Sequence, residues 1–354
     1  MVGANAQGKT SLLEAAAWAA TGASFRHVPD AALVRAGCDA AIVRAEVVDG
    51  ARTQLLEAEI RAVGRNRVRL NQSPVSRARD RRELMRVTVF APDDLQLVKG
   101  GPAERRAYLD DLLVSVAPRY EAVLADYERV LRQRNALLKQ RFGADPDDET
   151  TMQVFDTQLA RAGAELGRGR ARMLDRLVPM VGEAYDDLAG SDTAAVDATY
   201  EPEWWSPPGT FDAAAPDLAA AEASDVITAL LDALRSRRKA ELDRKVTLAG
   251  PHRDEWRLRV RGLDARTHAS QGEQRTLALA LRLGGHRLCA ETTGSAPVLL
   301  LDDVFSELDS TRSSALVAHL VSGQTLLTTA GEVPLGVHAE HVLRVDAGVV
   351  RAAA

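Results

Sequence analysis

The stretch Gly3-Ala4-Asn5-Ala6-Gln7-Gly8-Lys9-Thr10 follows the spacing G-x-x-x-x-G-K-[ST] of a phosphate-binding loop. Its glycines allow backbone turns that a Cβ atom would block, so successive N–H groups point at one anion. Lys9 supplies positive charge to the β- and γ-phosphates, and Thr10 offers a hydroxyl to Mg²⁺. The helical run that starts at Ser11 directs its positive end at the phosphates. We therefore predict an ATP site over residues 3–11; the alternative is a glycine-containing turn before an ordinary helix.

The composition narrows the class of protein. With 354 residues, the chain is long enough for two domains or for one large domain with an insertion. Its net charge is −5, so binding to nucleic acid has to use a local basic patch. The two cysteines, Cys38 and Cys289, are expected to be reduced, as is typical of a cytosolic protein. We see no signal peptide and no apolar run of roughly 18 residues, so we expect a cytoplasmic protein without a membrane partner.

The pattern along the chain changes twice. Residues 40–90 read as short strands, with Asp49-Gly50 as a hairpin turn. Residues 103–245 are mostly helical in spacing, apart from the irregular stretch 191–220, and short strands return from residue 246. This order predicts an α/β head formed by residues 1–102 and 246–354, with a helical, coiled-coil-like arm lobe over 103–245. Two separate domains in series are the alternative. The predicted strands of the first part are Ala41–Val48, Thr53–Arg61, Arg67–Leu70 and Val87–Phe90.

A second acidic motif completes the predicted site. Pro297–Leu301 is a short apolar run followed by Asp302 and Asp303, as in a buried parallel strand with carboxylates at its end. Ligands gather at the carboxyl ends of such strands. We predict that Asp302 holds Mg²⁺ beside Thr10 and that Asp303 polarises the attacking water as a general base. A strand followed by a solvated acidic turn is the alternative.

Three further polar segments are open to two interpretations. Ser270 and Gly272 precede a predicted helix from Thr276 to about Glu291, and they form either a second anion-binding helix end or a simple N-cap. Two chains placed head to tail would use both anion-binding ends. Asp309 similarly reads as an N-cap or as a residue at a subunit interface. His252, in the compact polar run 250–255, is interpreted as a hydrogen-bonded loop residue, and no chemistry is assigned to it.

Together these motifs resemble the RecF family of DNA repair ATPases, relatives of the SMC heads of the ABC type. The resemblance implies a P-loop ABC-type ATPase head with a helical lobe. It also implies ATP-dependent homodimerisation on DNA and weak, DNA-dependent ATP hydrolysis used as a switch. The implied roles lie in DNA replication, recombination and the SOS response, with RecO and RecR as partners in loading RecA at single-strand gaps. The matching pieces are Gly3–Thr10, 90–95, 98–106, Gly250–Asp254, Ser270–Arg275 and Leu300–Asp309.

The resemblance also implies roles for single residues. Lys9 and Thr10 bind the phosphates and Mg²⁺, with Lys9 counted among the catalytic residues. Asp302 is the metal residue and Asp303 the catalytic carboxylate. Ser270 and Gly272 contact the γ-phosphate of the partner subunit. Thr328 or Thr329 lies where many such heads place a switch residue, which is often histidine.

The resemblance predicts a strand, a turn and a second strand before Gly3, whereas only Met1 and Val2 precede it. Two explanations remain: a start codon placed too late, or a truncated and ATPase-impaired DNA-binding scaffold. A transporter's nucleotide-binding subunit is a third reading, which the Ser270–Arg275 segment and the long helical insert disfavour.

A local excess of arginine suggests how the chain contacts DNA. Between residues 61 and 86 there are nine arginines but only two acidic residues, Asp80 and Glu83. Such a strip would bind the phosphates of DNA without recognising the base sequence. Aromatic residues are absent there, so base stacking is not indicated. A second basic group lies at 129–141, and solvated surface arginines are the alternative interpretation. The nine are Arg61, Arg65, Arg67, Arg69, Arg77, Arg79, Arg81, Arg82 and Arg86, of which the first four are the predicted DNA-binding residues.

Overall fold

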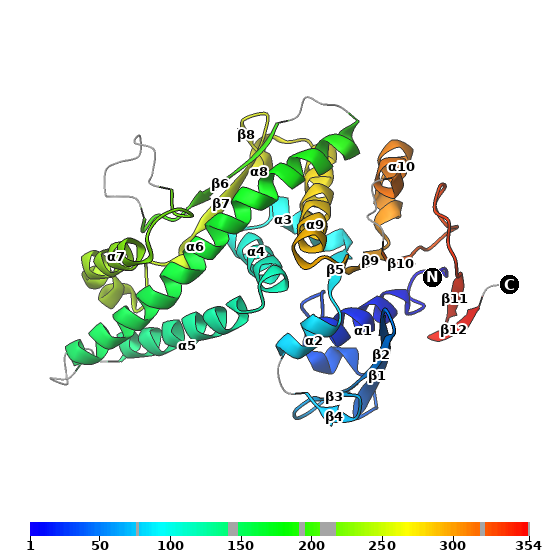
Figure 1. The fold of residues 1–354 in the computed structure, drawn as a ribbon, viewed down its shortest axis with the longest axis horizontal. Coiled ribbons are helices and arrows are strands. Elements are labelled where there is room, and N and C mark those ends of the chain that lie inside the picture. The colour runs from blue at the N-terminus through cyan, green and yellow to red at the C-terminus, as the bar shows by residue number, and fades with distance from the viewer. Residues whose placement is uncertain (76–77, 141–147, 191–194, 206–216, 319–322, 353–354) are drawn as a thin grey trace. The chain divides into compact units, whose positions relative to one another are not determined.

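The computed structural model describes residues 1–75, 78–140, 148–190, 195–205, 217–318 and 323–352 (Figure 1). The chain forms two compact units. The first contains residues 1–95, 183–193 and 275–354, and the second contains residues 96–182 and 194–274. The assignment of residues 1–102 and 246–354 to an ATPase head, and of 103–245 to an arm lobe, stays a prediction.

A parallel sheet with strand order β10-β9-β5 forms the centre of the first unit. The middle strand, β9 (Val298–Asp302), is buried over Leu299–Asp302, so the predicted buried strand before the carboxylates is confirmed. Leu300 packs against Leu13 and Ala17 of helix α1 (Lys9–Thr21). The flanking strands are β5 (Val87–Phe90) and β10 (Thr325–Thr328).

An antiparallel sheet in the order β1-β2-β3-β4 covers another face of α1. Alternate residues of β2, including Leu56 and Ile60, are buried with Trp18, which is the pattern of a strand with one side in a core. The hairpin turn is formed by Gly50 and Ala51, one residue later than predicted, and Gly50 has a φ of 56°. The strands are β1 (Ala40–Asp49), β2 (Arg52–Arg61), β3 (Arg67–Leu70) and β4 (Ser73–Pro74).

The remaining elements of the first unit are short, apart from α9 and the end of α6. A C-terminal hairpin, β11 (Leu343–Asp346) with β12 (Val349–Ala352), lies beside the N-terminus in Figure 1. The other elements are η1 (Asp30–Leu33), α2 (Ala78–Leu84), η2 (Pro92–Leu95), α9 (Gln271–Thr293), η4 (Val304–Glu307) and α10 (Ser310–Ala318). Helix α9 enters this unit at Arg275.

The second unit combines long helices with the sheet β6-β7-β8. One expectation is wrong: residues 196–201, predicted to be irregular, form β6, which pairs antiparallel with β7. The two strands lie about 60 positions apart in the chain, and such distant pairing leaves no local signal. The elements are α3 (Gln96–Lys99), α4 (Pro102–Val116), α5 (Tyr120–Lys139), α6 (Asp148–Ala189), β6 (Val196–Glu201), α7 (Ala223–Arg244), η3 (Pro251–Arg253), β7 (Glu255–Val260), β8 (Leu263–Asp264) and α8 (Ala265–His268).

A buried ion cluster joins three helices of the second unit. The side chain of Arg134 on α5 is fully buried and donates to Asp156 of α6 at 2.8 Å and to Glu241 of α7 at 2.6 Å. It also donates to the Thr247 hydroxyl at 2.8 Å. Arg238 forms a second ion pair with Asp156. Because these charges are out of water, each depends on its partners far more than a surface pair would.

We expect Arg134→Ala to lower the free energy of unfolding by about 3–5 kcal/mol, because it leaves two buried carboxylates without their main cation. Urea unfolding measures this loss. Arg132→Ala is the control, since Arg132 and Glu128 form an exposed pair at 3.4 Å whose removal costs at most about 1 kcal/mol. Equal unfolding midpoints for the two variants would contradict the role given to the cluster.

Candidate nucleotide site

The P-loop connects Val2 to helix α1 through a tight turn. Ala6 and Gly8 have φ values of 64° and 100°, and Gly8 caps the helix that begins at Lys9. The Lys9 side chain is buried and donates to the carbonyl oxygens of Gly3 at 2.7 Å and Ala4 at 2.8 Å. The ammonium group is therefore held inside the loop, where the sequence places a phosphate.

Thr10 and Asp302 meet although they are 292 positions apart in the chain. The Thr10 hydroxyl donates to Oδ1 of Asp302 at 2.9 Å. A hydroxyl that donates its proton to a carboxylate keeps oxygen lone pairs for a cation, and Mg²⁺ prefers such oxygen ligands. The predicted pairing of these two residues at the carboxyl end of β9 is thus present in the structure.

Asp303 is held in an unusual conformation next to this pair. Its φ is 50°, in the left-handed region that a non-glycine residue rarely adopts. Its Oδ1 is buried and has no hydrogen-bond partner among the described residues. A buried carboxylate oxygen of this kind calls for a cation, a water or a ligand donor. The residues present therefore fit a Mg²⁺–triphosphate group with an attacking water.

Lys9, Thr10 and the two carboxylates at the end of β9 line one cavity of about 400 Å³. Its lining also includes Arg26, which the sequence reasoning missed. The Arg26 guanidinium donates to the buried Glu14 of α1, and this hydrogen bond raises its pKa above the ordinary value. Arg26 belongs to no recognisable sequence motif, because only the folded arrangement of the chain after α1 brings it to the cavity. The lining residues are Asn5, Ala6, Gly8, Lys9, Thr10, Ser11, Arg26, Asp302, Asp303 and Thr328.

The C-terminal hairpin supports the P-loop from outside the cavity. Val2 donates to Leu343 O at 2.8 Å and accepts from Val345 N at 2.9 Å. Gln7 accepts from two backbone amides of the hairpin turn, Ala347 N at 2.6 Å and Gly348 N at 3.0 Å. Val2 also forms parallel bridges to both Thr329 and Arg344, and so fills a strand position before the loop.

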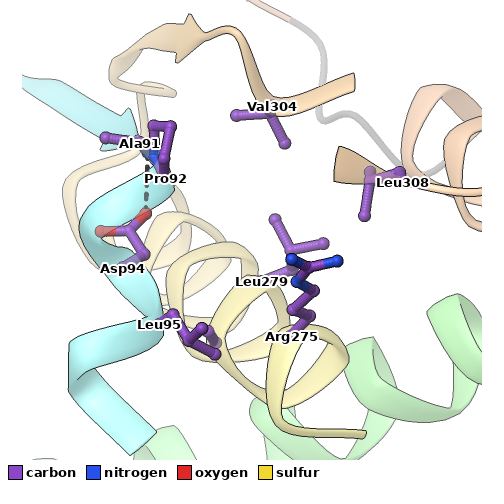
Figure 2. A pocket seen from close by; sticks show the side chains of 9 residues that line it. Ala91, Pro92, Asp94, Leu95, Arg275, Leu279, Val304 and Leu308 are labelled. Carbon is purple, nitrogen blue, oxygen red and sulfur yellow. Dashed lines mark hydrogen bonds between the residues drawn. The ribbon is translucent and has the colours of Figure 1, made fainter. Parts of the chain in front are cut away.

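The motif at residues 90–95 is tied to α9 in the same unit. The Asp94 carboxylate accepts from Ala91 N at 2.9 Å, drawn as a dashed line in Figure 2, and from two Arg282 nitrogens at 2.9 and 2.7 Å. A small pocket of about 40 Å³ lies there, lined in part by Arg275, Val304 and Leu308. It has room for one or two waters but not for a nucleotide.

Ser270 begins α9 with a capping box. Its backbone N–H donates to the Glu273 carboxylate at 2.8 Å, and its hydroxyl accepts from Glu273 N at 3.3 Å. The N-cap interpretation of Ser270 is therefore confirmed. Ser270 and Gly272 lie in the second unit and the P-loop in the first, so their contact with the γ-phosphate of a partner subunit stays a prediction.

His252 and Asp309 have structural roles. The Nδ1 of His252 lies 2.7 Å from the Tyr127 hydroxyl, and its Nε2 lies 3.2 Å from Thr247 O. Burial, with the charge of nearby Arg253, lowers the pKa of His252 to about 4, so the ring is neutral at pH 7. Asp309 accepts from Arg312 N at 2.9 Å as the N-cap of α10, and its interface role stays a prediction.

The arginines of the strip lie in two different environments, the outer side of the antiparallel sheet and the surface of the Trp18 ring. Arg61, Arg67 and Arg69 lie on the outer side of the antiparallel sheet, where Arg61 and Arg67 pair with Glu59 at 2.8 and 3.7 Å. Arg65 and Arg69 form no ion pair among the described residues. Arg81 instead lies over the Trp18 ring, 5.7 Å from its centroid. Arg77 lies outside the described residues.

The described ranges contain neither a metal-binding cluster of protein side chains nor a helix that could span a membrane. No group of three or more histidine, cysteine or acidic side chains is arranged there to hold a metal ion. In the same ranges, no helix has the length and apolar character that a membrane span requires.

A P-loop before α1, with β9 ending in carboxylates beside it, defines an ATPase head of the ABC type. The chain belongs to the RecF family of DNA replication and repair proteins. It is 43% identical over 340 residues to RecF of Cutibacterium acnes, covering 93% of this chain and 85% of that protein. RecF of Frankia alni is 46% identical over 334 residues, with 93% and 86% covered.

Solved structures agree with this assignment. A recombination mediator protein described as RecF-ATP in the RecFOR pathway superposes with a TM-score of 0.88 at 27% identity, covering 100% of this chain and 91% of that one. The Smc head domain of Pyrococcus furiosus gives a TM-score of 0.53 at 14% identity, with 99% and 88% covered, and shares the fold alone. No family model matches the chain.

We expect Gly3→Ala to lower the free energy of unfolding by about 1–3 kcal/mol, because the new Cβ would collide with the carbonyl oxygen of Val345. Thermal unfolding of the full chain measures the change. Gly182→Ala in α6 is the control, since its Cβ would meet no atom within 4 Å and helix interiors favour alanine by about 0.5–1 kcal/mol. A wild-type melting temperature for Gly3→Ala would rule out this close support of the loop.

Proposed function

We propose that the chain is an ATP-switched, DNA-binding recombination mediator with weak ATP hydrolysis. The observation that carries the proposal is the 2.9 Å hydrogen bond between Thr10 and Asp302, which joins the P-loop to the acidic end of β9. Membership of the RecF family and the similarity to a RecF-ATP structure support the same conclusion. In this role the chain cooperates with RecO and RecR in loading RecA at single-strand gaps.

The side chains of the cavity divide the work of binding and hydrolysis. Lys9 and Arg26 offset the negative charge of the phosphates, and Thr10 and Asp302 hold Mg²⁺. Bound Mg²⁺–ATP supplies the reactive phosphoanhydride and the charge that neutralises its oxygens. Asp303 accepts a proton from the attacking water through its carboxylate, whose buried Oδ1 has no hydrogen-bond partner in the part of the chain that the structure describes. A second subunit completes the site with Ser270 and Gly272.

We expect Lys9→Arg to reduce ATP-dependent dimerisation on gapped DNA at least tenfold. The planar guanidinium cannot take the place of the compact ammonium group between Gly3 O and Ala4 O. Sedimentation velocity with ATP and gapped DNA measures the dimer fraction. The control is Lys239→Arg, which changes an exposed residue of α7.

Dimerisation of Lys9→Arg at the wild-type level would contradict the proposal that ATP binding switches dimerisation on. It would instead favour an ATP-independent DNA-binding scaffold, in which the P-loop is a structural remnant. If ATP-dependent dimerisation were lost in both Lys9→Arg and the Lys239→Arg control, the cause would be a general defect in folding. That result would also speak against the proposed ATP switch.

The proposed DNA contact uses the outer side of the β2–β3 hairpin, with Arg61, Arg65, Arg67 and Arg69. The pairs that Arg61 and Arg67 form with Glu59 are partly exposed, and such pairs are worth at most about 1 kcal/mol. Phosphates can therefore replace Glu59 as partners at little cost. Arg65 and Arg69 need no such exchange, which makes them the first contacts of the proposed surface.

We expect reversal of Arg65, Arg67 and Arg69 to glutamate to weaken binding to duplex DNA. The slope of log affinity against log salt concentration is negative, and its magnitude should fall by about 2–3, because each lost phosphate contact removes about 0.9. Fluorescence anisotropy at several salt concentrations measures both. Reversal of Arg235, Lys239 and Arg244, exposed on α7, is the charge-matched control. An unchanged slope in the first variant would exclude the strip.

A further inference from the structure

We propose that Thr328 is a positioning residue that orients both acidic residues at the end of β9 through a single hydroxyl group. The inference rests on the proposed function, because its purpose is the alignment of Asp302 and Asp303 for a Mg²⁺–nucleotide. It gives Thr328, the last residue of β10, a role different from that of a switch residue that contacts the nucleotide directly.

The Thr328 hydroxyl bonds in both directions. It donates to Oδ1 of Asp302 at 2.8 Å and accepts from the backbone N–H of Asp303 at 3.0 Å. The side chain is 1% exposed, so water does not compete for these bonds. Since Thr10 donates to the same Asp302 oxygen, that carboxylate is fixed from two sides. The parallel register that sets Thr328 beside Asp302 provides this geometry.

The bond to Asp303 matters because of the backbone conformation there. A φ of 50° is uncommon for a non-glycine residue, although aspartate adopts it more readily than most, and hydrogen bonds to the residue help to hold it. The Thr328 hydroxyl holds the amide of this residue. The same conformation places the Asp303 carboxylate on the cavity, where its Oδ1 is buried and no described residue forms a hydrogen bond with it. Loss of the hydroxyl should therefore release the acidic group that is proposed to activate water.

Thr329, the next residue in the chain, forms different hydrogen bonds from Thr328. The Thr329 hydroxyl lies 3.4 Å from Glu332 O and 3.3 Å from Gly331 N, in the turn after β10. It has no bond to either acidic residue. Thr329 and Thr328 thus have the same side chain and adjacent places, but only Thr328 acts on the site.

The test compares Thr328→Val, Thr328→Ser and Thr329→Val in the full chain. Valine keeps the branched shape and removes the hydroxyl, whereas serine keeps the hydroxyl. The readouts are ATP turnover, its Mg²⁺ requirement, binding of a fluorescent ATP analogue in EDTA, and amide hydrogen exchange at Asp303 without nucleotide.

For Thr328→Val we expect turnover to fall about 10- to 100-fold, the range for losing one hydrogen bond to a charged group. The Mg²⁺ requirement should rise, exchange at Asp303 should accelerate, and metal-free nucleotide binding should change less than about twofold. Thr328→Ser and Thr329→Val should stay within about threefold of wild type in every readout.

Wild-type turnover and unchanged exchange at Asp303 in Thr328→Val would overturn the inference. Equal losses in Thr328→Ser would also overturn it, since they would show that packing and not the hydroxyl is required. If the wild-type chain bound no ATP, the proposed function would fail, and amide exchange at Asp303 would still decide whether Thr328 positions this residue.

Discussion

The hydrogen bond between Thr10 and Asp302 is the contact on which the rest of the nucleotide site depends. It is 2.9 Å long and partly buried, and it joins the start of α1 to the end of β9. Around it, Leu13 and Ala17 pack on Leu300, so the helix and the strand are fixed to each other by apolar burial as well. The carboxylates and the P-loop therefore share one rigid framework, as phosphoryl transfer chemistry requires.

Charged residues serve two purposes in this chain, and burial separates them. Arg134, Asp156 and Glu241 are buried and hold three helices of the second unit together. Arg61, Arg65, Arg67 and Arg69 are at least partly exposed and are available to an external polyanion. A count of charges along the sequence cannot tell these uses apart, because Arg132 and Arg134 differ only in the side of α5 that they occupy.

Local patterns predicted much of the fold. The P-loop, the strand before Asp302 and the bounds of β3 and β5 were visible because each depends on neighbours in sequence. Other features depend on contacts between distant segments and were missed. Strand β6 needs β7, Arg26 reaches the cavity only after α1 is placed, and the parallel register of β10 brings Thr328 to Asp302. No local rule carries that information.

The support that β11 and β12 give to Val2 and Gln7 has a consequence for synthesis of the chain. The P-loop is made long before the groups that hold it, because Thr10 precedes Asp302 by 292 positions and Gln7 precedes Ala347 by 340. At roughly 5–20 residues per second, translation leaves this loop without its framework for about 15–60 seconds. Helix α1 meanwhile presents Leu13 and Ala17 without Leu300, their buried partner on β9. Until β9 is made, the nascent first unit therefore exposes apolar surface of α1 that the finished protein buries.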